Sequence, residues 1–153
     1  MSKKLLILLV TIGAAILFAS TGIYAGTAPP DTMHLYEKAF KKHKKGPVAF
    51  PHKKHIEEYK LKCGECHHDA DHKPLNNLKM TDDVQRCIEC HKATKRVKGE
   101  KLSKKAKIKK YYEYAMHENC KSCHKAFNKK KTGKVKGPAP TSCKQCHAKK
   151  KKK

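Results

Sequence analysis

Residues 63–68 read CGECHH, and the shorter pattern inside this stretch, Cys-x-x-Cys-His, occurs four times along the chain. The cysteine pairs are Cys63/Cys66, Cys87/Cys90, Cys120/Cys123 and Cys143/Cys146, and the histidines that directly follow them are His67, His91, His124 and His147. These pairs use all 8 cysteines. Because histidine makes up 11 of 153 residues, four such placements would coincide by chance roughly 3 times in 100,000. The repetition therefore indicates that each pair requires a neighbouring histidine.

This pattern is the signal for covalent attachment of haem c. Residues three apart share one helix face, so one turn can hold both thioethers, and the adjacent histidine binds the iron as proximal ligand. Disulfides would explain an even cysteine count in an exported protein, and zinc knuckles also use closely spaced cysteines. Neither alternative requires a histidine directly after every pair. The sequence therefore predicts four covalently attached haems, with iron as the metal.

The rest of the chain is poor in residues that build an apolar core. It has no Trp, only 4 Phe, and 33% charged residues. A mature chain of about 128 residues normally buries a sizeable apolar core. A Lys-rich composition would also suit disorder, but four porphyrin rings would supply the missing apolar volume. We therefore expect a mainly α fold with little regular secondary structure, packed around four haems.

Seven further histidines are available for the second face of each iron: His34, His43, His52, His55, His68, His72 and His117. Four irons need only four of them, which argues against an open catalytic iron. The same supply makes methionine ligation, which would raise the potential, the weaker alternative. Three of the seven lie in polar stretches, and we expect them to be surface residues without a role: His34, His43 and His72.

Local geometry separates the remaining candidates. His67 and His68 are neighbours and point about 100° apart on a helical turn, so they must serve different irons. His52 and His55 lie three apart after Pro51 and can offer their rings to two separate haems.

Three stretches carry a resemblance to a known family: FPHKKH (50–55), CGECHH (63–68) and YYEYAMH (111–117). With the attachment patterns around them, they resemble the tetrahaem cytochrome c3 family, the class III c-type cytochromes of anaerobic respirers of sulfate and metals. The resemblance covers about residues 46–148. This chain differs from many members of that family, because all four of its attachment sites have the short Cys-x-x-Cys-His spacing.

The resemblance implies a short N-terminal β-hairpin and a complete set of bis-histidine ligands. By that resemblance the distal and proximal histidines pair as His52 with His67, His68 with His91, His55 with His124, and His117 with His147.

Four segments are predicted along the chain. Residues 1–25 read as a signal peptide, because two lysines precede an uncharged run and the segment ends in the small residue Ala25. The alternative is an uncleaved anchor, since 5–25 is long enough to span a bilayer. Residues 26–46 are expected to be a flexible lead-in, 47–148 the tetrahaem domain, and 149–153 a lysine tail.

A few elements can be placed within the domain. The sequence predicts a strand over 47–50 and a Gly/Pro loop over 132–141. Thr81, followed by two aspartates, is expected to cap a helix that runs into Cys87. Ser103 is expected to cap the longest helix, roughly 104–118.

The formal net charge is +24, and four haems with two propionates each lower it by up to about 8. Lysines gather around the last attachment site, at Lys129 to Lys131, Lys134, Lys136, Lys144 and Lys149 to Lys153. They favour acidic redox partners, although a terminal lysine run can also be only a solubilising tail. Nucleic acid is not expected as a partner, because the chain is exported and offers no aromatic stacking surface.

These features predict a periplasmic, low-potential electron carrier and not an enzyme, with no small-molecule substrate. The resemblance implies hydrogenase or formate dehydrogenase as donors, and membrane cytochrome complexes or terminal acceptors in anaerobic respiration. Contact with the membrane is expected only if the leader is retained. The alternative is a small multihaem reductase of metal, sulfur or nitrogen oxyanions, which would need an iron with an open coordination position.

Overall fold

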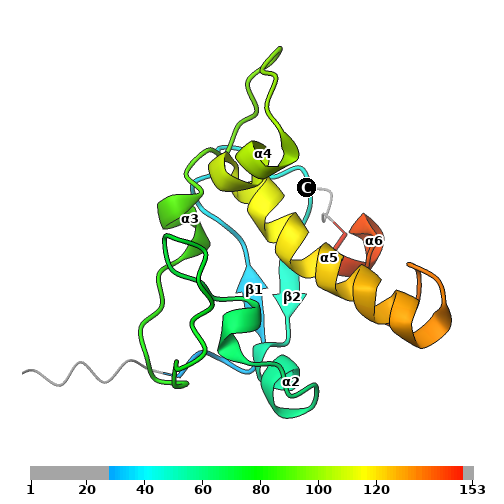
Figure 1. The fold of residues 1–153 in the computed structure, drawn as a ribbon. Helices are drawn as coiled ribbons and strands as arrows, with labels where there is room; N and C mark the ends of the chain where they lie inside the picture. The colour runs from blue at the N-terminus through cyan, green and yellow to red at the C-terminus, as the bar shows by residue number, and fades with distance from the viewer. Residues whose placement is uncertain (1–27, 150–153) are drawn as a thin grey trace, which may run out of the picture.

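The computed structural model describes residues 28–149, so the predicted leader (1–25) and residues 150–153 of the predicted tail lie outside the described residues. Within that range, five α-helices and a two-stranded sheet are joined by long irregular segments (Figure 1). The elements are β1 (Met33–Leu35), β2 (Val48–Phe50), α2 (His52–Glu57), the 3-10 turn η1 (Cys63–Glu65), α3 (Cys87–Cys90), α4 (Lys104–Lys110), α5 (Tyr112–Thr132) and α6 (Cys143–Cys146). The predicted fold class, mainly α with little regular structure and a short N-terminal hairpin, is confirmed.

The hairpin connects the beginning of the described chain to its end. β1 and β2 are antiparallel, with Met33 opposite Phe50. The sequence predicts β2 and the resemblance implies a partner strand, but the position of β1, in the segment expected to be a flexible lead-in, was not predicted. The Ala148 N–H donates to Pro47 O at 3.2 Å. A Cβ on Gly46 would lie 2.5 Å from Ala148 O, so this close approach requires glycine.

The longest helix of the described residues lies further along the chain than the one predicted over 104–118. Ser103 caps α4 as expected, its Oγ accepting from Ala106 N at 3.2 Å. α4 ends at Lys110, however, because Tyr111 is extended, and α5 then continues through the third attachment motif to Thr132. The break is stabilised by Tyr111, whose side chain is only 3% exposed and whose hydroxyl donates to Glu100. The prediction of one helix over 104–118 is wrong because this long-range packing interrupts it.

The predicted helix from Thr81 into the second motif is also wrong. α3 is a single turn that begins at Cys87. Asp82 accepts instead from Lys79 N at 2.8 Å in a turn before it. The helix start is capped by Glu89, whose Oε1 accepts from Arg86 N at 3.3 Å.

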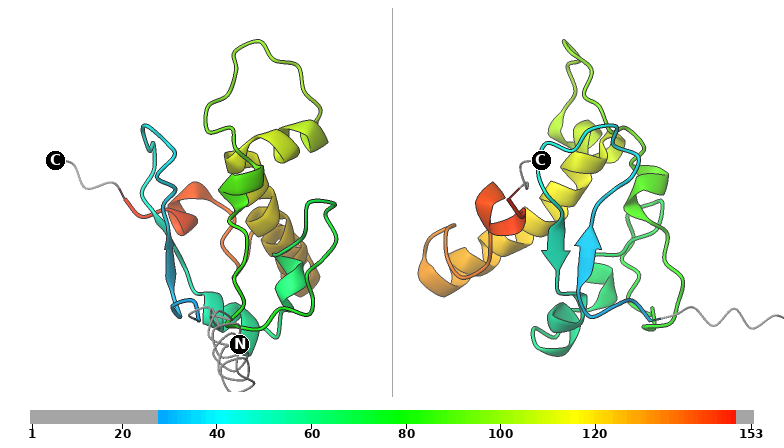
Figure 2. Two further views of the ribbon diagram at one scale, coloured as in Figure 1. Left: turned by 90° about the vertical axis from the view of Figure 1, so that its left-hand side faces the viewer. Right: turned by 180° about the vertical axis from the view of Figure 1, so that it is seen from behind.

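The described chain has almost no apolar interior of its own. Tyr111 is its one buried hydrophobic residue, and His91 and Asn128 are its buried polar residues. The hairpin and α5 lie on opposite sides of the molecule, with α2 at one end (Figure 2). The polypeptide of residues 28–149 thus buries very little of its own apolar surface, as expected for a protein whose interior is supplied by bound groups.

Among residues 28–149, no helix combines the length and the apolar character needed to cross a membrane.

Candidate haem sites

Each Cys-x-x-Cys-His pattern forms a single helical turn. η1, α3 and α6 are little more than this turn, and the third pattern lies inside α5. The histidine N–H donates to the carbonyl of the first cysteine of its motif, at 2.8 Å for His67 and 2.9 Å for His91 and His147. All eight thiols are unpaired. The turn therefore presents two thiols and one imidazole together, as the two thioethers and one iron bond of haem c require.

Three pairs of histidine rings lie at nearly the same distance from each other, with angles of 25°, 75° and 86° between the ring planes. The ring centroids are 6.3 Å apart for His55 and His124, 6.2 Å for His68 and His91, and 6.3 Å for His117 and His147. Two metal–imidazole bonds of about 2 Å, with about 1.1 Å from each nitrogen to its ring centre, give about 6.2 Å between rings on one metal ion. Each pair joins a motif histidine to one from elsewhere. The spacing fits one iron between each pair of rings.

Backbone carbonyls orient five of these six rings. The Nδ1 atoms lie 2.9 Å from Pro51 O for His55, 2.7 Å from Asp69 O for His68, 3.0 Å from Lys109 O for His91, 2.7 Å from Pro140 O for His124, and 2.9 Å from Gly46 O for His147. An Nδ1–H that donates to a carbonyl leaves the lone pair on Nε2. Each of these five imidazoles is therefore in the tautomer that binds iron through Nε2.

The sixth ring, that of His117, has an acidic side chain beside it instead. Its Nδ1 lies 3.9 Å from Oε1 of Glu113, one helical turn earlier. That carboxylate also accepts from Arg96 Nη2 at 2.7 Å. Burial lowers the pKa of His117, and the charges of Lys121 and Arg96 act in the same direction against the opposing effect of Glu113. The neutral imidazole, which is the form that binds iron, is favoured near neutral pH.

His52 and His67 line the same small hollow, but their rings are not paired like those of the other three histidine pairs. This hollow of about 40 Å³ is lined by Phe50, His52, His55, Ile56, Leu61, Lys62, Cys63, Cys66 and His67. Burial lowers the pKa of both histidines, and the nearby His52 lowers that of His67 further. The Nδ1 of His52 is buried without a hydrogen-bond partner. The structure thus brings the expected ligand pair and both thiols of the first motif to one place.

The four attachment motifs are grouped around Cys120. Burial and the nearby thiols of Cys66, Cys146 and Cys87 together raise the pKa of the Cys120 thiol to about 11. These three cysteines belong to the other three motifs. Because the repulsion between charged thiols falls with distance, this influence places all four motifs close to the middle of α5.

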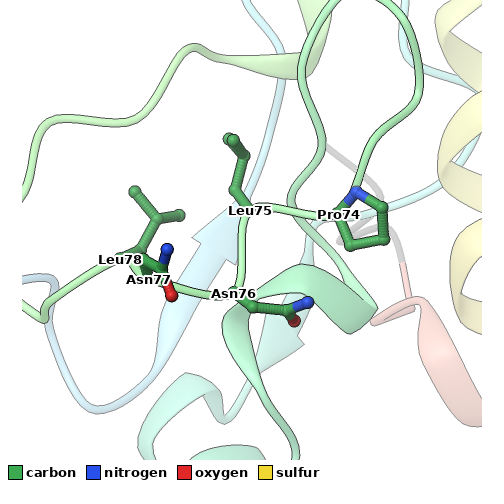
Figure 3. Close-up of a pocket in the computed structure, with 5 residues that line it drawn as sticks. All are labelled: Pro74, Leu75, Asn76, Asn77 and Leu78. Carbon is green, nitrogen blue, oxygen red and sulfur yellow. The ribbon is translucent and has the colours of Figure 1, made fainter.

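A second hollow, of about 230 Å³, lies beside the first motif in the segment 74–78 (Figure 3). It is lined by Pro74, Leu75, Asn76, Asn77 and Leu78. The carbonyl of Leu78 lies 3.6 Å from the Cys63 Sγ, and a Cβ on Gly64 would lie 2.3 Å from Asn76 Oδ1. This loop therefore packs directly on the turn that carries the first pair of thiols and offers it apolar side chains.

The three histidines predicted to be surface residues differ from one another. His34 and His72 are exposed, and His72 has a φ of 63°. His43 is half-buried, with its ring stacked on Tyr36 at 3.7 Å and 5.5 Å from that of Phe40, and its Nε2 is buried without a partner. The prediction that His43 is a surface residue is wrong, because the chain folds back so that Tyr36 and Phe40, which lie earlier in the same polar segment, contact its ring.

One-turn attachment motifs, facing imidazoles and a nearly absent apolar core together define a small multihaem c-type cytochrome. Comparison with known proteins gives the same result, because the Class III cytochrome C family matches residues 29–147. The chain belongs to the class III cytochrome c family. Membership implies covalently bound haem c and identifies the chain as an electron-transfer protein.

Two relatives match this chain over nearly their whole length. Cytochrome c3 of Maridesulfovibrio salexigens is 38% identical over 130 residues, which are 81% of this chain and 98% of the relative. Cytochrome c3 of Desulfovibrio desulfuricans is 32% identical over 124 residues, which are 80% of this chain and 97% of the relative.

Proposed function

We propose that the chain is a periplasmic, low-potential electron carrier that holds four haem c groups, each iron bound by two histidines. The ring pairs at 6.2–6.3 Å carry this proposal. The thioether cysteines are the four pairs of the attachment motifs, and His67, His91, His124 and His147 are the proximal ligands. The distal ligands are His52, His68, His55 and His117, in the order of the irons they share with those four.

The protein groups around the rings favour electron transfer over catalysis. When bound, haem supplies a one-electron iron couple. Two histidines on every iron leave no coordination position for a substrate. The carbonyls that accept from Nδ1 make five of the eight proposed imidazole ligands stronger donors, which stabilises the oxidised iron and lowers the potential. We infer low potentials suited to donors such as hydrogenase or formate dehydrogenase and to membrane or terminal acceptors in anaerobic respiration.

The exported protein is expected to contain four haems, all low-spin. Its mass should equal that of the processed polypeptide plus four haem groups, and pyridine haemochrome analysis should give the same number. EPR of the oxidised protein should show only low-spin ferric signals, because every iron has two imidazole ligands. Three haems would contradict the ligand assignment. A high-spin ferric signal in the intact protein would favour a reductase with an open site.

The partners we propose are acidic redox proteins, and an exposed lysine cluster supports this. It consists of Lys129, Lys130, Lys131, Lys134, Lys136, Lys144 and Lys149, around the end of α5 and around α6. All seven are exposed, and none takes part in an ion pair with another residue of the segment 28–149. Free positive charge around a haem edge accelerates the encounter with a negatively charged partner.

Replacing Lys129, Lys130 and Lys131 together by glutamine is expected to lower the second-order rate of electron transfer from an acidic hydrogenase about tenfold at low ionic strength, because steering charge is lost. Stopped-flow measurements over a range of salt concentrations would test this. The matched control replaces Lys41, Lys42 and Lys44, which carry the same charge on the exposed lead-in. Equal rate losses in both triple variants would show that only net charge matters, not this cluster.

A further inference from the structure

Asn128 is the one fully buried side chain among residues 28–149, with 0% exposure. It lies near the end of α5 between Phe127 and Lys129, both of which are exposed. A buried amide is costly unless its hydrogen-bonding groups have partners. A polar side chain that is completely enclosed in a protein with almost no core indicates a specific positioning task.

The amide of Asn128 clamps the loop that folds back after α5. Its Nδ2 donates to Val135 O at 3.1 Å and to Ala139 O at 2.9 Å, and its Oδ1 accepts from Ala139 N at 2.9 Å. Both backbone groups of Ala139 are therefore held by one side chain. Gly137 lets the loop pass close by, because a Cβ on it would lie 2.8 Å from Asn128 Oδ1.

The residue that Asn128 holds, Ala139, directly precedes the residue whose carbonyl contacts an imidazole. Pro140 follows Ala139, and its carbonyl lies 2.7 Å from Nδ1 of His124. Pro140 has no N–H with which to fix itself and lies outside every helix and strand. The corresponding carbonyl for His91 belongs to Lys109, which lies within α4. The loop carbonyl therefore depends on Asn128 for its position, whereas that of Lys109 is held by a helix.

We propose that Asn128 is a positioning residue for the haem ligand His124: it holds Pro140 O against Nδ1 and so sets the orientation and donor strength of that imidazole. The inference rests on the proposed role of His124 as an iron ligand. Donation from Nδ1–H to a carbonyl increases electron density at Nε2, which favours oxidised iron. Loss of the clamp should therefore raise the potential of one haem and leave the other three unchanged.

Two variants test this, Asn128→Ala, which removes all three side-chain bonds, and Asn128→Asp, which keeps an acceptor for Ala139 N but removes both donors. Potentiometric titration followed by NMR of the four haems should show one potential rising, with a larger rise for alanine than for aspartate. The hyperfine-shifted Nδ1–H resonance of His124 should broaden or exchange faster. The control is Ala126→Ser, a neutral change at an exposed position of the same helix, which should leave all four potentials unchanged.

The outcomes separate this inference from the proposed function. Four unchanged potentials, or four that shift together, in variants that retain four low-spin haems would overturn the role of Asn128 alone. If the Asn128→Ala protein does not incorporate four haems, the four haem potentials of Asn128→Asp are judged by the same criterion. A wild-type protein without a haem at Cys120 and Cys123 would instead overturn the proposed function.

Discussion

Replacing all eight cysteines by alanine is expected to leave the chain without a cooperative fold, even though the four motif histidines and their partners remain. Ordering each residue costs about 1–2 kcal/mol of backbone entropy, and Tyr111 is the one hydrophobic residue that the described chain buries. The 21-residue α5 is the longest helix among residues 28–149, yet an isolated helix of this length with many lysines is marginal in water. Far-UV circular dichroism should show mostly unordered chain, and heating should give no sigmoidal transition.

The matched control is the unaltered chain matured with haem, which should melt cooperatively and at high temperature. A second control is the unaltered chain produced without haem attachment, which should behave like the cysteine-free variant. A colourless protein with a cooperative transition would contradict the view that porphyrin rings form the interior. It would instead indicate that the polypeptide buries apolar surface in an arrangement different from the one described.

The attachment turns could be predicted from the sequence because all the groups they need lie within five consecutive residues. The Ser103 cap and β2 were predictable for the same reason, since their signals are local. The helix break at Tyr111 was not, because it depends on two long-range hydrogen bonds that no nearby pattern encodes. The Tyr112 N–H donates to Ala93 O at 3.1 Å, and the Tyr111 hydroxyl donates to Glu100.

In the candidate sites, too, local features could be predicted from the sequence and long-range contacts could not. The partners of the motif histidines came from the resemblance to a family, and the structure brings three of those four pairs together as facing rings. The groups that orient the rings were missed, because every residue has a carbonyl and the sequence does not indicate which one a ring will contact. Asn128 was missed as well, and its only signal is an amide between Phe127 and a run of lysines shortly before a Gly/Pro loop.

Replacing His55 by alanine is expected to open one iron of four. His55 faces His124 across 6.3 Å with an angle of 25° between the ring planes, so its removal leaves that iron with a single protein ligand. Alanine favours helix, and the substitution therefore leaves α2 intact. One haem should become high-spin in the oxidised protein and bind carbon monoxide when reduced, and its potential should rise because a strong imidazole donor is lost. EPR, carbon monoxide difference spectra and potentiometry measure these effects.

The matched control is His34→Ala, which removes an exposed histidine of β1 whose ring is paired with no other aromatic ring of the segment 28–149. It should retain four low-spin haems that do not bind carbon monoxide. His55→Met provides an intermediate case, because a thioether keeps the iron six-coordinate while raising its potential above that of the bis-histidine form. If His55→Ala holds four haems and none binds carbon monoxide, His55 is not an iron ligand. If the unaltered protein already binds carbon monoxide at one haem, an open iron exists in the native state, and reductase activity becomes the stronger proposal. The response of one iron to the loss of one imidazole thus distinguishes a carrier that excludes substrates by coordination from an enzyme that admits them.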